Sequence, residues 1–118
     1  MASERVGRNK ADLWRHTGTG AANTEFSLIV THAGSGRVNC VCAKYSAAPT
    51  QAGIKVVLDS GAGTSYDSTL HTGTANAQST VYNPGGIIAL GFDDALVVTA
   101  PAGGPGITAA ISVYTEDL

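Results

Sequence analysis

The stretch VVLDSGAGTS, residues 56–65, contains the residue types of a paired-carboxylate catalytic centre. Asp59 follows two β-branched residues and a leucine, and Ser60 and Gly61 come directly after it. Two aspartates brought close together share one proton, because two like charges at that distance cannot both be ionised. A homodimer would supply one Asp59 from each chain, and small residues such as Ser60 and Gly61 would let the two loops approach each other.

This stretch resembles the active-site signature of aspartic proteases, whose small retroviral-type members are homodimers of similar chain length. The run IIALGFDDAL, residues 87–96, resembles a late Leu-Gly-x-Asp-x-Leu stretch of that family. The spacing departs from the family, because Gly91 follows Asp59 by only 32 residues and leaves too little chain for the family's flap hairpin. The residues from Ala95 onwards also alternate as in a strand, where the family has a short helix.

A β-strand followed by a glycine turn also explains the sequence of residues 56–65. In that interpretation the strand ends at Leu58, Asp59 and Ser60 bond the turn backbone, and Gly61 and Gly63 adopt positive φ. The sequence favours this turn, and a homodimeric protease that uses Asp59 remains as the alternative from the enzyme class.

Other chemical motifs are absent from the sequence. His16, His32 and His71 lack the spacing of metal ligands, the glycine-rich stretches are not phosphate-binding loops, and no G-x-S-x-G motif is present. Cys40 and Cys42 are one residue apart and point to one face of a strand, where such close neighbours seldom bridge, so we expect buried, reduced thiols. The sequence therefore predicts no enzyme, no cofactor and no metal site.

Seven segments alternate with a period of two and are separated by glycine-rich turns. The predicted strands cover residues 25–32, 37–46, 53–60, 64–73, 77–83, 95–101 and 106–114. Within the second strand, Val38, Cys40 and Cys42 are expected on one face and Asn39, Val41 and Ala43 on the other. The loop PAGGPG, residues 101–106, predicts a hairpin between the last two strands.

This pattern predicts an all-β fold. We expect an antiparallel β-sandwich, jelly-roll-like, with about seven to eight short strands and an extended N-terminal arm. Residues 1–24 would form the arm and residues 25–118 the β-sandwich domain.

Composition and charge narrow the range of partners. Charged residues are 14% of the 118, and the net charge is −2, which argues against nucleic acid as the main partner. Residues 1–16 carry four basic and two acidic residues, whereas residues 17–118 carry three basic and seven acidic ones. A basic opening on an acidic body is typical of an interaction arm, and a solvated terminus beside a solvated domain is the alternative. No apolar stretch is long enough for a membrane span or a signal peptide, so we expect a soluble protein made in the cytoplasm, without membrane contact.

Three stretches together resemble small β-sandwich virion proteins of tailed bacteriophages, of the head decoration or cement type. They are the polar opening ASERVGRNKADLWRHTGTG, the turn and small-residue strand THAGSGRVNCVCAKYSAAP, and the closing DDALVVTAPAGGPGITAAISVYTEDL. The resemblance covers most of the chain and includes no catalytic residue.

The resemblance implies a protein that binds the major capsid protein on the surface of the assembled head and stabilises it. It also implies self-association as a homotrimer, with a dimer as the alternative. The N-terminal arm is then the expected capsid contact, through Arg5, Arg8, Lys10 and Arg15 for acidic patches and Trp14 for an apolar pocket. A head–tail joining, tail or fibre protein of the virion remains as an alternative function. A carbohydrate-binding sandwich would need exposed aromatic residues, for which Tyr45, Tyr66 and Tyr82 are the candidates.

Overall fold

The computed structural model describes residues 2–6, 13–32, 34–50 and 53–117. These residues form ten strands and one short 3-10 helix, η1 (Thr64–Tyr66). The strands are β1 (Ala2–Arg5), β2 (Leu13–Gly20), β3 (Phe26–Val30), β4 (Gly36–Tyr45), β5 (Lys55–Asp59), β6 (Ser68–Thr72), β7 (Ser79–Tyr82), β8 (Ile88–Leu90), β9 (Ala95–Ala100) and β10 (Ala109–Asp117).

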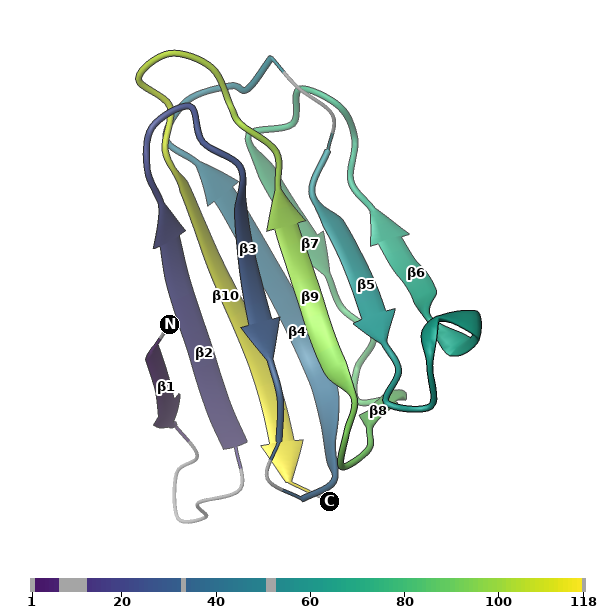
Figure 1. Cartoon of the computed structure of the whole chain (residues 1–118). Coiled ribbons are helices and arrows are strands. Elements are labelled where there is room, and N and C mark those ends of the chain that lie inside the picture. Colours follow the sequence, from purple (N-terminus) through teal and green to yellow (C-terminus); the bar gives the residue numbers. More distant parts are fainter. Residues whose placement is uncertain (1, 7–12, 33, 51–52, 118) are drawn as a thin grey trace.

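The strands form two antiparallel sheets that lie face to face (Figure 1). One sheet, sheet A, has the order β1-β2-β10-β4-β7, and β8 also pairs with β4. The other, sheet B, has the order β3-β9-β5-β6. Apart from β1 and β8, this places four strands opposite four, with the chain crossing repeatedly between the sheets, as in a double-sheet jelly roll. The predicted all-β sandwich is confirmed.

The core lies between the two sheets and is formed by every second side chain of each strand. In β10 the buried positions alternate with more exposed ones, and β9 follows the same pattern. The two inner faces meet without a helix between them, because every second side chain of a strand points to the same side. The buried apolar residues of this core are Leu28, Val30, Val38, Val41, Ala43, Tyr45, Ile54, Val56, Leu90, Leu96, Val98, Ala100, Ala109, Ile111 and Val113.

The seven predicted strands correspond to β3, β4, β5, β6, β7, β9 and β10, whereas β1, β2 and β8 were not predicted. Residues 2–5 and 13–20 fall in the predicted arm, yet in the structure they are strands of sheet A. The predicted hairpin across residues 101–106 is wrong. Strand β9 belongs to sheet B and β10 to sheet A, so this loop crosses from one sheet to the other.

A β-bulge in β4 corrects the predicted faces of that strand. Tyr114 is aligned with Cys40, but the next residue of β10, Thr115, is aligned with Val38, so Asn39 is an extra residue. An extra residue moves the following side chains to the opposite face. Val38 and Val41 therefore both point into the core, and Cys40 lies on the outer face, half-buried rather than buried.

The two sheets pack closely together along the glycine-containing end of β2. A Cβ atom on Gly18 would lie 2.7 Å from the Phe26 ring, and one on Gly20 would lie 2.6 Å from the Phe26 Cβ, so β3 packs directly on the β2 backbone there. At the other end of β2 the inward positions are Trp14 and His16, which need much more space. The sequence of β2 thus creates a wider gap at this end of the sandwich, and polar residues gather in it.

Candidate functional site

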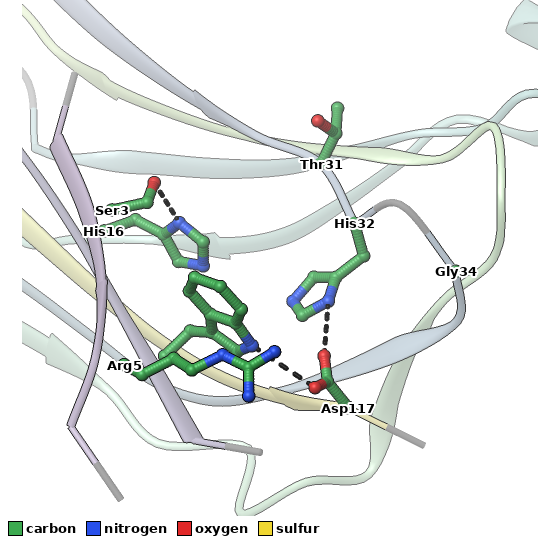
Figure 2. A pocket seen from close by; sticks show the side chains of 8 residues that line it. Ser3, Arg5, His16, Thr31, His32, Gly34 and Asp117 are labelled. Carbon is green, nitrogen blue, oxygen red and sulfur yellow. Dashed lines mark hydrogen bonds and ion pairs between the residues drawn. The ribbon is translucent and has the colours of Figure 1, made fainter. Parts of the chain in front are cut away.

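A hollow of about 430 Å³ lies at this end of the sandwich, between β2 and the segment that follows β3. Its lining comes from β1, β2 and the C-terminal end of β10 in sheet A, and from the segment that follows β3 (Figure 2). Its lining residues are Ser3, Arg5, Trp14, His16, Thr31, His32, Gly34 and Asp117.

Four side chains, Ser3, His16, Thr115 and His32, form a continuous hydrogen-bonded chain beneath the hollow, and Asp117 lies beside its last member as an ion-pair partner. Ser3 Oγ lies 2.7 Å from His16 Nδ1, and His16 Nε2 lies 2.9 Å from Thr115 Oγ1. Thr115 Oγ1 is also 2.6 Å from His32 Nε2, and His32 Nδ1 is 3.3 Å from Asp117 Oδ1. His16, His32 and Thr115 are all buried, so these bonds satisfy groups that water does not reach.

The direction of this chain follows from its acidic end. The carboxylate of Asp117 favours a proton on the facing nitrogen, His32 Nδ1, and the tautomer with that proton has Nε2 as an acceptor. Thr115 then donates its hydroxyl proton to His32 and accepts from His16 Nε2–H. His16 Nδ1 is left as the acceptor for the Ser3 hydroxyl. With these directions, each hydrogen bond of the chain has one donor and one acceptor.

The electrostatics of the hollow favour the neutral form of His16. Burial, and to a smaller extent the charge of nearby His32, lowers the pKa of His16 below its ordinary value. Burial acts in this direction because it penalises the charged imidazolium more than the neutral ring. The lowered pKa and the hydrogen-bond directions therefore agree.

Trp14 forms one wall of the hollow and has three close partners, Arg5, His16 and Asp117. The guanidinium carbon of Arg5 lies 4.7 Å from the ring centroid, and the His16 ring is stacked at 6.5 Å with an interplanar angle of 15°. Trp14 Nε1 donates to Asp117 Oδ2 at 3.3 Å. Arg5 is exposed and lies at the rim, so a cation held over an indole ring faces solvent at the mouth of the hollow.

The structure separates the predicted contact residues. Arg5 and Trp14 are aligned across β1 and β2 and meet at the hollow. Arg15 points to the opposite face of sheet A, where it forms an ion pair with Glu4. Arg8 and Lys10 lie outside the described residues.

Sequence reasoning did not identify the hydrogen-bonded chain. One signal was present: the inward alternation of Ile111 and Val113 continues to Thr115, a polar residue that is fully buried. A hydroxyl at a core position requires a buried partner, and the only side chains it bonds among the described residues are the two histidines.

The Ser3–His16 distance is in the range found between a nucleophile and its general base, but the carboxylate of Asp117 contacts His32 and not His16. Asp117 orients His32, and Thr115 stands between His32 and His16. The bonds instead join β1, β2, the segment after β3 and β10. The arrangement is therefore a polar cross-link between these elements, and Trp14 is joined to it through Asp117.

Asp59 lies away from this hollow. It is exposed at the end of β5, aligned with Ala95, on the outer face of sheet B. The prediction that Ser60 bonds the turn backbone is confirmed, because Ser60 Oγ accepts from the Ala62 amide at 3.1 Å. The carboxylate that bonds this turn is Asp67 rather than Asp59, since the Ser60 amide donates to Asp67 at 2.8 Å.

The two glycines of this turn have different roles. Gly63 has a φ of 117°, as predicted. Gly61 was predicted to need positive φ too, which is wrong; it is required because a Cβ there would lie 2.3 Å from the Asp93 Cβ. The carboxylate of Asp94 accepts from the Gly61 amide at 2.9 Å and from the Gly91 amide at 2.8 Å. These backbone bonds lower the pKa of Asp94.

Among residues 2–6, 13–32, 34–50 and 53–117, no group of three or more histidine, cysteine, aspartate or glutamate side chains could hold a metal ion. The same part of the chain contains no helix with the length and apolar character needed to cross a membrane. Comparison with protein-family models finds no match, and comparison with curated proteins finds no similar sequence.

Proposed function

We propose that this protein is a capsid decoration protein of a bacteriophage virion, which binds the major capsid protein with the β1–β2 edge of sheet A. The observation that carries the proposal is the Arg5–Trp14 pair at the mouth of the hollow. Arg5 offers charge-assisted hydrogen bonds to an acidic group, and Trp14 offers a rigid aromatic surface beside it. Arginine and tryptophan are the residue types most enriched among the strongest contacts of protein interfaces.

The jelly-roll fold supports this proposal by analogy, since viral capsid proteins use it repeatedly, although lectins and cupins use it too. A decoration protein also needs only modest affinity for each contact. When a trimer engages several capsomers at once, the later contacts form within one complex and add to the overall affinity.

The location of the protein is tested by its copy number. Gradient-banded particles of the phage that encodes it would be analysed by quantitative mass spectrometry against the major capsid protein. Near-stoichiometric abundance is expected for decoration. A handful of copies per particle would move the protein to the neck, tail or fibre, and absence from the particles would contradict a virion role.

The contact is tested by charge reversal at the hollow. Particles lacking the protein would be mixed with purified wild-type chain, Arg5→Glu or Arg15→Glu, and the bound fraction measured by co-sedimentation. We expect Arg5→Glu to weaken binding by about tenfold or more, because it removes a cation and adds a charge of the wrong sign. Arg15→Glu makes the same charge change on the same sheet but the opposite face, and binding should change far less. If both variants lost the same fraction of binding, only the net charge of the protein would matter, and a contact at Arg5 would be contradicted.

A further inference from the structure

A row of aliphatic side chains crosses the outer face of sheet B. Ile29, Val97 and Val57 are aligned on the neighbouring strands β3, β9 and β5. Each has a buried core residue beside it along its strand, so alternation turns the row outward. Ile29 is 55% exposed, and the two valines are half-buried. Isolated apolar residues are normal on a protein surface, whereas apolar side chains that gather on one face are a feature of interaction sites.

Charges of opposite sign flank this row at equal distances along β5. Lys55 lies two residues before Val57 and Asp59 lies two residues after it, so all three project from the outer face. At about 3.3 Å per residue, the two charges are roughly 13 Å apart. Both are exposed, and within the part of the chain that the structure describes neither takes part in an ion pair. Each can therefore be reached by a charge on another molecule.

This arrangement is complementary to a second copy of itself. Consider a two-fold axis that lies between two facing copies and runs across the strands at the level of Val57, so that the two β5 strands are antiparallel. Lys55 of each copy then faces Asp59 of the other, and the two aliphatic rows meet at the centre. Parallel stacking would instead place like charges opposite each other. In Figure 1 the strands of sheet B lie in front of sheet A, and no other element of the described chain covers this face.

We propose that the outer face of sheet B is a self-association surface, on which a second copy of this chain packs face to face with the two β5 strands antiparallel. The charges favour a second copy over an unlike protein, because β5 carries one charge of each sign on either side of an aliphatic centre. The contact gives a dimer, which is the alternative to the trimer implied by the sequence resemblance. It is independent of the proposed capsid contact, because the Arg5–Trp14 pair belongs to sheet A.

Sedimentation equilibrium of the full chain tests the aliphatic row. Wild type, Ile29→Glu and Val81→Glu would be compared at concentrations up to about 1 mM. Val81 is the matched control, because it is 63% exposed on the edge strand β7, on the outer face of the other sheet. We expect wild type and Val81→Glu to dimerise equally, and Ile29→Glu to dimerise at least about tenfold more weakly, because its carboxylate would be buried without a partner. A wild type that stays monomeric, or equal dissociation constants for the two glutamate variants, would overturn the proposal.

Exchange of the two charges tests the antiparallel arrangement. Lys55→Glu and Asp59→Lys each place like charges opposite each other across the contact, so each should dimerise at least about tenfold more weakly than wild type. The double variant has complementary charges again and the net charge of wild type, and it should recover most of the affinity. Circular dichroism melts show whether each variant is folded. A folded double variant that dimerises no better than the single variants would overturn the antiparallel contact.

Discussion

At the scale of single residues, Asp117 lies beside one end of a hydrogen-bonded chain whose other end, Ser3, is 114 positions earlier in the sequence. A carboxylate accepts only, so each donor and acceptor along the chain is assigned in turn. Thr115 is the member that makes this possible, since a hydroxyl can accept from one histidine and donate to the other. A valine at this position would leave two buried imidazole nitrogens without partners, at a cost of about 1–3 kcal/mol for each.

The lowered pKa of His16 predicts that the fold loses stability in mild acid. The folded protein favours neutral His16, whereas the unfolded chain protonates it with an ordinary pKa of about 6.5. The unfolded state therefore binds more protons between the lowered pKa and about 6.5, and the free energy of unfolding rises with pH across that window. The contribution is complete above the window and is lost as pH falls through it.

Urea unfolding at pH 7 and pH 5 measures this effect. Wild type is expected to lose stability on going to pH 5, and His16→Gln should lose less, because glutamine has no charge to gain. His71→Gln is the matched control, since His71 stacks on Tyr82 outside the hydrogen-bonded chain. If His16→Gln and wild type show the same pH dependence, His16 is not the group responsible.

At the scale of elements, apolar alternation predicted seven strands, while β2 was missed for a physical reason. Its inward positions are Trp14, His16, Gly18 and Gly20, so it shows no apolar period, and two glycines lower its strand propensity. Strand β4 was found, but its faces were exchanged after Asn39, because a bulge depends on pairing with β10 and leaves no local mark in the sequence.

Gly36 at the start of β4 provides a prediction about how elements pack. A Cβ on Gly36 would lie 2.8 Å from His32 Cγ and Nδ1, so the ring would have to move. Its bonds to Thr115 and Asp117 would then be strained or lost. We expect Gly36→Ala to lower the free energy of unfolding by about 1–3 kcal/mol.

Gly34 offers a control two residues earlier. A Cβ there would meet no atom within 4 Å, so Gly34→Ala should change stability little. Thermal and urea unfolding of both variants would be compared with wild type. A Gly36→Ala variant as stable as Gly34→Ala would mean that the His32 ring relaxes without cost and is not held by Gly36.

At the scale of the whole molecule, the first and last strands of the described chain, β1 and β10, belong to the same sheet. Strand β10, at the C-terminal end, pairs with β2 on one side and β4 on the other. The sequence could predict strands and turns, but not which sheet each strand joins, because period two is the same in both sheets. That is why the loop at residues 101–106 was predicted as a hairpin and is a crossover. The hollow was unpredictable for the same reason, since it is assembled from β1, β2, β10 and the segment after β3.

This placement of the ends predicts how far the N-terminus can be shortened. Removing residues 1–12 deletes β1 with Arg5 and Ser3 but leaves all of β2 paired with β10. The shortened protein should fold, with a stability loss of about 1–2 kcal/mol from the lost bond to His16 and the lost edge strand. It should no longer bind capsids.

Removing residues 1–16 also deletes Trp14 and His16 and half of β2, which leaves the Thr115 hydroxyl without one of its two hydrogen-bond partners in the core. This longer deletion should lower the melting temperature much further or prevent folding. Circular dichroism melts and co-sedimentation with particles would compare the two. If both deletions gave the same melting temperature, the first half of β2 would be a detachable arm. If the protein lacking residues 1–12 still bound particles, the capsid contact would lie elsewhere.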